Sequence, residues 1–337
     1  MKQYDAIIIG FGKGGKLLAA ELAERNWKVA IVERSPQMYG GTCVNVGCIP
    51  TKALIHESEY AEKRYYDDYK NQSKLYALAV ARKDKLVSFL REKNYENVKN
   101  KPNITLYDGT ASFLSENTIR IVSGKDETIL EGKEIFINTG STPILPAIDG
   151  LKESKYVYTS ETLLQSNKLP AHLLVIGGGD TGSDCIGTSV RQGAASVTQI
   201  EIMPQPPIGH NDATPWPQWP VVLKTTSSHE EGCTRRWSLA SNRFIGKNGK
   251  VCGVEVEEVE WLPAAEGGRP TMRPTGKKEI IDTDMVLLAM GFLKPEQPEF
   301  AENVFVAGDA ANGASLVVRA LADGRKAARQ IDLYCSR

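Results

Sequence analysis

The chain has 337 residues, enough for about two domains with cores of ordinary size. Its 41 basic and 41 acidic side chains balance, so the composition excludes any charge-driven reason to expect a nucleic acid or an acidic membrane as partner. The N-terminal apolar run is only four residues long, too short for a signal peptide or a membrane span. Six cysteines are too sparse for a secreted disulfide scaffold, and these features together predict a soluble cytoplasmic protein.

The first predicted elements form a nucleotide-binding βαβ unit. A buried strand meets a GxGxxG pattern, an amphipathic helix follows, and a second strand ends in Glu33. Gly10 permits a tight turn, Gly12 lets backbone N–H groups approach a pyrophosphate, and Gly15 lets helix and strand pack closely. The helix N-terminus adds partial positive charge. Because Glu33 follows Gly10 by 23 residues, it is placed to accept from a ribose 2′-hydroxyl.

The stretch YGGTCVNVGCIPTK at 39–52 contains Cys43 and Cys48. In an ideal helix their Cα atoms would lie about 7.5 Å apart along the axis, whereas a disulfide needs roughly 4.4–6.8 Å. The segment must therefore bend, which Gly47 permits. Pro50 suits a first helical turn, so Cys48 is expected near a helix N-terminus, where the dipole favours thiolate. We interpret the pair as redox-active. A structural disulfide and a zinc half-site are the alternatives, but the other cysteines lack zinc spacing, so no metal site is predicted.

Two further segments extend this first domain. Residues 53–100 carry charged and apolar side chains at helical spacing, which predicts a helical excursion over its surface. The stretch KEIFINTGSTP at 133–143 is a buried strand that ends in Thr139 and Gly140. The end of this strand is expected at the bound dinucleotide.

The glycine pattern recurs in the middle of the chain, after a strand at about 173–176. Its glycines are Gly177, Gly179 and Gly182. Two dinucleotide folds in one chain imply a flavin and a nicotinamide dinucleotide that exchange a hydride. Glu201, at the end of the second strand, favours the 2′-hydroxyl of NAD(H), whereas Arg191 could answer a 2′-phosphate. Spacing does not decide between them, and a solvated helix charge explains Arg191 equally well.

The C-terminal part returns to the first domain. The buried strand TDMVLLAMGFL at 283–293 contains Gly291, and a later strand ends in Gly308 and Asp309 before a helix. Asp309 is expected to bond the ribityl chain of FAD. Between the two fingerprint regions and this return, residues 204–220 are rich in proline and tryptophan and are predicted to form a loop.

These elements predict an α/β fold with two Rossmann-like dinucleotide-binding domains, the NAD(P)H domain being inserted into the FAD domain. The predicted boundaries are 1–150 for the first part of the FAD domain, 151–295 for the NAD(P)H domain and 296–337 for the return segment. The predicted cofactors are FAD and NAD(P)H.

Together the motifs resemble two flavoprotein families. Residues 1–170 are similar to the pyridine nucleotide-disulfide oxidoreductases, which include dihydrolipoyl dehydrogenase, glutathione reductase and mercuric reductase and whose signature is GGTCVNVGCIPTK. The stretches RKDKLVSFLREKNY and NITLYDGTASF resemble the reactive-chlorine-resistance or mercuric-reductase-like branch. Residues 172–337, with GGGDTGSDCIGTSVRQGAASVTQIEIMPQPP and AGDAANGASLVVRALADGRKAA, resemble the NADPH-oxidising small subunit of glutamate synthase. The chain is therefore interpreted as a fusion with its seam near NKLPAHLLVIGGG.

The first resemblance implies roles within the cysteine segment. Cys48 would be the sulfur next to the flavin, and Cys43 the sulfur that exchanges with substrate. Lys52, one helical turn after Cys48, would place a cation near the flavin and stabilise its reduced form. Asp184 on the second fingerprint helix would pair with this lysine, an exposed helix carboxylate being the alternative. The signature also contributes two predicted FAD-binding residues, Gly41 and Thr42.

Each resemblance also implies features that this sequence does not show. Disulfide reductases continue into an interface domain that carries a His-Glu pair and makes the dimer, and we expect this chain to lack it, because its histidines all precede Gly308. The glutamate synthase subunit begins with a cysteine-rich iron–sulfur domain, for which the cysteines are missing. Both families place a longer segment where Ala307 follows Gly291 by only 16 positions, which bears on the stability of the flavin domain.

The predicted function is an FAD-dependent oxidoreductase that passes hydride from NAD(P)H to FAD and electrons to the Cys43–Cys48 disulfide. The disulfide would then reduce a small-molecule or protein disulfide, a metal ion or another oxidant. The alternative is an electron-input flavoprotein, similar to the glutamate synthase small subunit, that passes electrons to a protein acceptor while its cysteines stay idle. A chain that binds nucleotide without turnover is a third, non-enzymatic interpretation.

Overall fold

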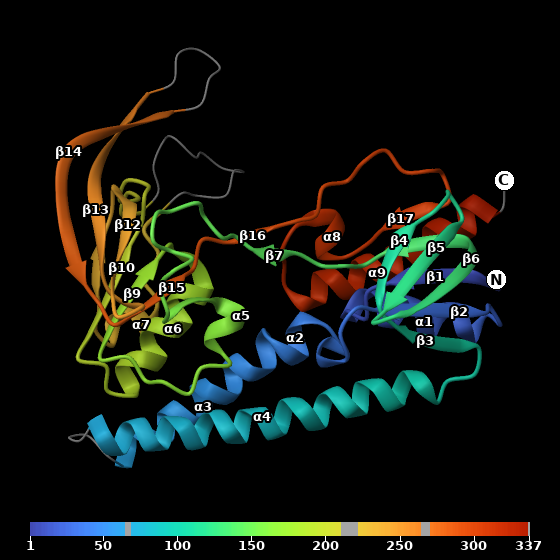
Figure 1. The fold of residues 1–337 in the computed structure, drawn as a ribbon, viewed down its shortest axis with the longest axis horizontal. Helices are drawn as coiled ribbons and strands as arrows, with labels where there is room; N and C mark the ends of the chain where they lie inside the picture. Colours follow the sequence, from blue (N-terminus) through green and yellow to red (C-terminus); the bar gives the residue numbers. More distant parts are fainter. Residues whose placement is uncertain (65–68, 210–221, 264–269, 336–337) are drawn as a thin grey trace. The chain divides into compact units, whose positions relative to one another are not determined.

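The computed structural model describes residues 1–64, 69–209, 222–263 and 270–335. The chain forms two compact units. Unit 1 comprises Met1–Pro50, Arg82–Pro143 and Gly291–Arg337, and unit 2 comprises Thr51–Ala81 and Ile144–Met290. Two helices, α3 (Cys48–Arg64) and α4 (Tyr69–Lys99), begin in one unit and end in the other (Figure 1). The helical character predicted at 53–100 is confirmed in the described residues, but the segment does not belong to the first domain alone, because Thr51–Ala81 are part of unit 2.

Unit 1 is built on a seven-stranded sheet in the order β3-β2-β1-β6-β5-β4, with β17 also beside β6. Strand β1 pairs in parallel with β2 and β6, and the pairs β2–β3 and β6–β17 are also parallel. Strand β5 pairs antiparallel with β4 and β6. The strands are β1 (Lys2–Ile9), β2 (Val29–Glu33), β3 (Ile104–Asp108), β4 (Thr110–Phe113), β5 (Thr118–Ser123), β6 (Asp126–Ile137) and β17 (Val304–Val306), and a small pair is formed by β7 (Thr142–Pro143) and β16 (Phe292–Leu293). The helices are α1 (Lys13–Glu24), the 3-10 turn η1 (Pro36–Met38), α2 (Thr42–Asn45), α8 (Asp309–Asn312) and α9 (Val317–Cys335).

One of the two buried clusters of unit 1 lies between this sheet and helices α1 and α9. Phe11, Leu18 and Phe136 are fully buried there, and each such side chain stabilises the fold by about 1.5–3 kcal/mol. The two helices approach closely because glycines face each other, so that a Cβ on Gly324 would lie 2.6 Å from the carbonyl oxygen of Gly14. The C-terminal helix therefore completes the domain that the first strand begins (Figure 1).

Unit 2 contains a five-stranded parallel sheet in the order β11-β10-β9-β15-β8 and a three-stranded antiparallel sheet in the order β12-β13-β14. Its strands are β8 (Val157–Thr159), β9 (His172–Ile176), β10 (Ser196–Ile200), β11 (Thr234–Arg236), β12 (Leu239–Lys247), β13 (Lys250–Leu262), β14 (Thr271–Asp282) and β15 (Met285–Leu288). Its helices are α5 (Ser160–Leu163), α6 (Gly179–Arg191) and α7 (Ser227–Glu230), besides the parts of α3 and α4.

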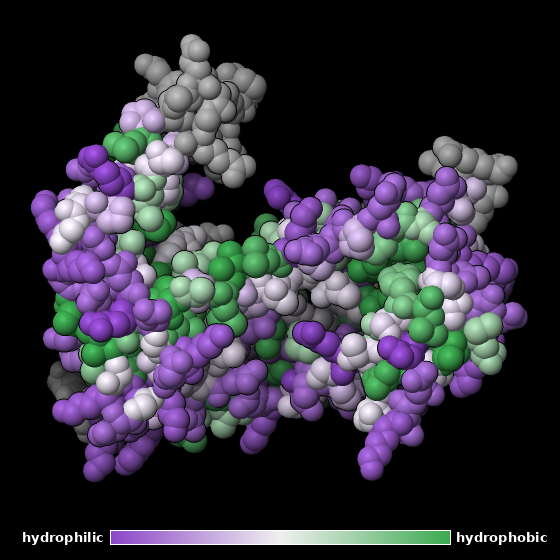
Figure 2. Space-filling model, turned by 45° about the horizontal axis from the view of Figure 1, so that its top comes forward, coloured by the Kyte–Doolittle hydropathy of each residue, from purple (hydrophilic) through white to green (hydrophobic). Residues whose placement is uncertain are grey.

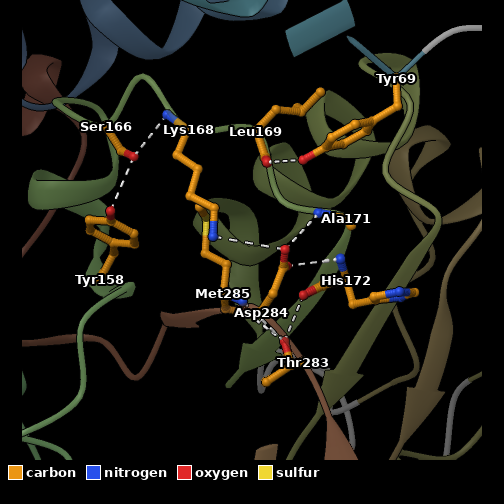
Figure 3. A network of polar contacts seen from close by, with 10 residues as sticks. All are labelled: Tyr69, Tyr158, Ser166, Lys168, Leu169, Ala171, His172, Thr283, Asp284 and Met285. Carbon is orange, nitrogen blue, oxygen red and sulfur yellow. Dashed lines mark hydrogen bonds and ion pairs between the residues drawn. The ribbon is translucent and has the colours of Figure 1, made fainter. Parts of the chain in front are cut away.

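A polar network holds the predicted seam in place within unit 2 (Figure 3). The carboxylate of Asp284 accepts hydrogen bonds from the backbone N–H of Ala171 at 3.2 Å and of His172 at 3.0 Å. The Tyr69 hydroxyl donates to the carbonyl of Leu169 at 2.7 Å, and the Leu169 side chain is buried. The seam segment is thus tied to the start of α4 on one side and to β15 on the other.

The predicted fold class, a mixed α/β chain with Rossmann-like parallel sheets, is confirmed. The first strand begins at Lys2, earlier than the apolar run indicated, because its start pairs with β6 in spite of its polar residues. The loop predicted at 204–220 lies mostly outside the described residues, as does His210. Hydrophilic side chains cover much of the face shown in Figure 2. Among the described residues, no helix is long and apolar enough to cross a membrane.

Candidate functional site

Unit 1 contains a cavity of about 370 Å³ at the carboxyl ends of β1, β2 and β6. Open α/β sheets bind ligands at this edge, and the volume falls within the usual range of ligand pockets. Seven predicted FAD-binding residues line the cavity: Gly10, Gly12, Glu33, Gly41, Thr42, Thr139 and Gly140. The structure therefore brings the fingerprint, the signature motif and the NTG strand end to one place.

Two glycine turns form one wall of the cavity by touching each other. Gly10 has φ +107°, and a Cβ there would lie 2.3 Å from the carbonyl oxygen of Asn138. Gly41 has φ +76°, and a Cβ there would lie 2.6 Å from the Cα of Gly12. Both turns thus require glycine for conformation and for space. The wall offers bare backbone that a pyrophosphate can approach closely, which fits FAD.

Glu33 is the acid that the sequence predicts to bind a ribose of the dinucleotide. It ends β2 and is almost fully buried. One carboxylate oxygen accepts from the backbone N–H of Phe11 at 2.9 Å, and the other accepts from that of Ser35 at 3.1 Å. Each oxygen keeps a further lone pair, so the carboxylate can still accept from a ribose hydroxyl at the cavity edge.

Asn138, which the sequence reading passed over, lies at the centre of this architecture. It is buried, and a Cβ on Gly15, Gly12 or Gly308 would meet its side chain at 2.6, 3.0 or 3.1 Å respectively. Its Nδ2 donates weakly to the carbonyl of Gly10 at 3.5 Å. The available signal was a polar residue at the end of an otherwise apolar buried strand, directly before Thr139.

The return segment packs behind the cavity against Asn138, and the predicted Gly308 and Asp309 are not among the residues that line it. Gly308 has φ +68° and donates its N–H to Asp323 at 2.7 Å. Asp309, the expected ribityl partner, begins α8 and accepts from the Ser315 hydroxyl at 2.8 Å. Both therefore sit in an ordered turn whose Gly308 faces the Asn138 side chain.

The shortened segment after Gly291 is held at the same cavity. Gly291 has φ +86°, and β16 directly after it pairs with β7. Leu293 and Pro295 line the cavity, and the Gln297 side chain donates to the carbonyl of Ala310 at 2.5 Å. The short connection thus contributes Leu293 and Pro295 to the cavity wall and is tied to α8 through Gln297.

The predicted redox cysteines lie next to this wall. Cys43 is in α2, one residue after the cavity-lining Thr42, and Cys48 begins α3. Both are free thiols, Cys43 half-buried and Cys48 exposed, and their side chains are hydrogen-bonded. Burial first, then the hydrogen bond with Cys48, raises the pKa of Cys43 to about 12. A Cβ on Gly47 would lie 3.0 Å from the carbonyl oxygen of Thr42 and 3.4 Å from the Cα of Cys43, so the chain folds back closely between the two cysteines.

Lys52 and Asp184 meet, although 132 residues separate them. Lys52 Nζ lies 3.5 Å from Asp184 Oδ2, which joins α3 to α6 within unit 2. The lysine side chain is 69% exposed and the aspartate 34%, so water screens the pair strongly.

The second fingerprint repeats the first in unit 2. Gly177 has φ +107°, and a Cβ there would lie 2.3 Å from the carbonyl oxygen of Ala289. Gly179 has φ +80° with nothing within 4 Å of its Cβ position. Gly182 has only ordinary contacts, the nearest being Val175 at 3.4 Å. The turn therefore has the same backbone requirement as the first fingerprint at Gly177, with looser packing behind it at Gly182.

The two predicted coenzyme-selecting residues lie in different surroundings. Glu201 follows β10 beside the glycine turn, where a Cβ on Gly178 would lie 2.8 Å from its Oε2. Arg191 donates to the Ser58 hydroxyl at 2.9 Å and pairs with Glu231. Glu201 instead forms an ion pair with Arg235, which the sequence analysis does not predict as a binding residue. The sequence feature that points to Arg235 is the pair of basic residues at the end of β11.

Two Rossmann-like units, a glycine-walled cavity and an adjacent dithiol are the features of a flavin-dependent oxidoreductase of the two-dinucleotide class. Residues 4–214 match the family model described as pyridine nucleotide-disulphide oxidoreductase, and the chain belongs to this family. Members of the family are flavin-dependent enzymes that use FAD and NAD(P)H. The family match thus confirms the predicted family and its cofactors, FAD and NAD(P)H.

Known relatives reflect both resemblances. The chain is 42% identical over 182 residues to the probable pyridine nucleotide-disulfide oxidoreductase RclA of Escherichia coli, covering 54% of this chain and 38% of that protein. It is 39% identical over 185 residues to the glutamate synthase [NADPH] small chain of Mycobacterium tuberculosis, covering 48% and 37%. The solved HOCl-induced flavoprotein disulfide reductase RclA from E. coli matches 96% of this chain and 69% of its own, with a TM-score of 0.73 and 29% identity. The sequence matches thus cover less than half the length of these two curated relatives.

Proposed function

We propose that this chain is an FAD-dependent oxidoreductase that takes hydride from NAD(P)H and delivers the electrons to the Cys43–Cys48 disulfide. The observation that carries the proposal is the continuity between the glycine-walled cavity and Cys43, the residue after cavity-lining Thr42. We assign FAD to unit 1 and NAD(P)H to unit 2, in line with the predicted domains. Bound FAD would supply a ring that accepts a hydride and passes on electrons.

The residues of unit 1 bind and orient the cofactor in this proposal. Backbone N–H groups at Gly12 approach the pyrophosphate at the start of α1, where the helix dipole favours negative charge. Glu33 accepts from a ribose hydroxyl while its two backbone donors hold it in place. Asp309 accepts from the ribityl chain, and the Ser315 hydroxyl fixes its orientation.

The two cysteines carry two electrons from the cofactor to the substrate by thiol–disulfide exchange. Two electrons and two protons break the Cys43–Cys48 bond and leave the two thiols that the structure contains. Deprotonated Cys43 then attacks a substrate disulfide, which forms a mixed disulfide and releases one substrate thiol. Cys48 attacks Cys43, which restores the intramolecular disulfide and releases the second thiol. Because its pKa is raised, Cys43 needs a base to remove its proton before it attacks.

The Lys52–Asp184 pair is assigned a role in stabilising the reduced cofactor. Lys52 follows Cys48 by four residues in α3, so it would stabilise negative charge on the reduced cofactor, and Asp184 would orient it.

Free thiols favour a reducing compartment such as the cytoplasm for this protein. Among the described residues, the free cysteines are Cys43, Cys48, Cys185, Cys233 and Cys252.

Anaerobic titration with NAD(P)H tests the relay. The purified protein should carry flavin that heating releases, and reduction should produce a long-wavelength absorbance band between a thiolate and the flavin. Cys48→Ser should abolish this band while the flavin still bleaches. If wild type and variant titrate alike, the cysteines are not on the path of the electrons.

The likeness to the glutamate synthase small chain favours a second candidate, an electron-input protein with idle cysteines. NAD(P)H oxidation that proceeds with a large protein acceptor, equally fast in Cys43→Ser, and without reduction of small disulfides would favour that candidate. Protein purified without flavin would contradict both.

A further inference from the structure

The acid of the second fingerprint is held by side chains. Gln199 Nε2 lies 3.5 Å from Glu201 Oε1, and Arg235 Nη2 lies 3.7 Å from the same oxygen. The other carboxylate oxygen, Oε2, faces the Cα of Gly178 in the glycine turn. Glu201 therefore presents one oxygen to the place where an adenosine ribose would lie and the other to a cation.

The cation is fixed by the sheet. Arg235 on β11 is the register partner of Gln199 on β10, so the two side chains share one face of the parallel sheet. Gln199 is fully buried and donates to the carbonyl of Gly177 at 3.1 Å. Arg235 stacks over the Trp237 ring at 5.0 Å and donates from Nη1 to the carbonyl of Lys224 at 3.1 Å. The guanidinium is thus oriented from several sides at the glycine turn.

Arg235 also keeps hydrogen-bonding capacity. Its Nη2 lies 3.7 Å from Glu201, which is an ion pair longer than a hydrogen bond, so this end of the guanidinium can still donate to another acceptor. Two other arginines in this part of unit 2 are engaged elsewhere, Arg191 with Ser58 and Glu231 and Arg236 with Glu279. Arg235 is therefore the arginine best placed to receive an anion beside Glu201.

We propose that unit 2 accepts both NADH and NADPH through the Glu201–Arg235 pair. Glu201 accepts from the ribose 2′-hydroxyl of NADH, and Arg235 receives the 2′-phosphate of NADPH. The arginine also offsets the carboxylate charge that would otherwise repel this phosphate. The inference rests on the proposed function only in placing a nicotinamide dinucleotide in unit 2, and it moves the choice of coenzyme from Arg191 to Arg235.

Calorimetric binding of NADH, NADPH and 2′,5′-ADP to the full chain tests the pair without measuring turnover. Wild type should bind the two coenzymes with Kd values within about tenfold of each other. Arg235→Gln should weaken NADPH and 2′,5′-ADP by about tenfold or more and leave NADH within about threefold. Glu201→Gln should weaken NADH by about tenfold and leave NADPH bound. Arg236→Gln, a neighbouring arginine paired with Glu279, is the matched control and should change none of these values.

A second variant guards against loss of folding. Arg235→Lys keeps the charge and loses the planar fork, so it should give an intermediate loss for NADPH. Equal weakening of both coenzymes in Arg235→Gln and Arg235→Lys would overturn the proposal, because the arginine would then only support the turn. Binding of NADH alone to wild type would also overturn it. Dual binding without electron transfer to the cysteines would sustain this inference and contradict the proposed function.

Discussion

Gly10 and Gly177 begin the two fingerprints with the same geometry. Each has φ +107°, and a Cβ at either would lie 2.3 Å from a carbonyl oxygen at the end of the neighbouring strand. That strand end is Asn138 in unit 1 and Ala289 in unit 2. The backbone requirement of the motif is thus identical in both units, and the side chains behind it differ.

This difference changes how tightly each turn is packed. In unit 1 the Asn138 side chain fills the space behind the turn, so a Cβ on Gly15 would approach it to 2.6 Å. In unit 2 a Cβ on the equivalent Gly182 would lie 3.6 Å from the small Ala289 side chain. The same glycine pattern therefore has tight packing behind it in unit 1 and looser packing in unit 2, which is consistent with the proposal that unit 1 holds FAD and unit 2 exchanges NAD(P)H.

The acids differ in the same way. Glu33 is anchored by two backbone N–H groups of fixed position, whereas Glu201 contacts the side chains of Gln199 and Arg235. Side-chain partners can change on ligand binding more readily than backbone ones. Glu33 is thus held by fixed backbone donors, whereas Glu201 has side-chain partners that can be exchanged for a ligand.

Replacing the first glycine should give the largest effect and should separate the two sites. Gly10→Ala forces an alanine into φ +107° and against a carbonyl, so FAD affinity should fall about 100-fold or more. Gly177→Ala has the same clash, so it should keep flavin and lose NAD(P)H binding by a similar factor. Flavin absorbance per chain and calorimetric coenzyme titration measure the two outcomes.

Gly124→Ala is the control for backbone strain alone. Gly124 has φ +61° with nothing within 4 Å of its Cβ position. The variant should lose about 1 kcal/mol of stability and keep both ligands. Full flavin content in Gly10→Ala would show that unit 1 does not bind FAD through this turn.

Replacing the third glycine should give effects of opposite sign. Gly15→Ala must displace the Asn138 side chain and the Gly10 carbonyl, so the free energy of unfolding should fall by about 2–3 kcal/mol. Gly182→Ala meets only ordinary contacts within α6, so it should raise that free energy by about 0.5 kcal/mol. Urea unfolding with coenzyme-free protein measures both.

Asn138→Ala gives unit 1 the side chain that unit 2 has, and it tests the cause of this difference. Combined with Gly15→Ala, it should recover part of the lost stability, because the 2.6 Å contact disappears while those with Gly10 and Ile8 at 2.9 Å stay. Strictly additive losses would show that Asn138 does not set the packing behind the turn.

The pH dependence of alkylation should show how the cavity wall affects Cys43. Since its pKa is raised to about 12, the thiolate fraction and the rate of modification by iodoacetamide should rise about tenfold per unit between pH 7 and 10. Cys48→Ala removes a hydrogen bond and a charge, so the pKa should fall but stay above its ordinary value, because burial is the larger cause. Peptide mass spectrometry of the reduced protein gives the rate, and a plateau below pH 9 would contradict the assignment.

The sequence predicted the parts of the site that depend on backbone. Glycine spacing and the terminal acid were sufficient for Gly10 and Glu33, because positive φ and close approach exclude most other residues. Asn138 and Arg235 could not be found in this way, since their roles arise from strand neighbours that only the folded sheet brings together. Arg191 shows the converse. Its position in the sequence suits a 2′-phosphate, but in the folded protein its guanidinium contacts Ser58 and Glu231.

The smallest effect is expected at the Lys52–Asp184 pair, which links the helix of the second fingerprint to α3. Because both side chains are substantially exposed, Asp184→Asn should lower the free energy of unfolding by less than about 1 kcal/mol, and 1 M salt should remove the difference. Asp184→Glu, which keeps the charge, is the control. A loss well above 1 kcal/mol that persists in salt would mean that this contact, like those around Asn138, is set by packing, and the contrast between a rigid unit 1 and a looser unit 2 would then fail at α6.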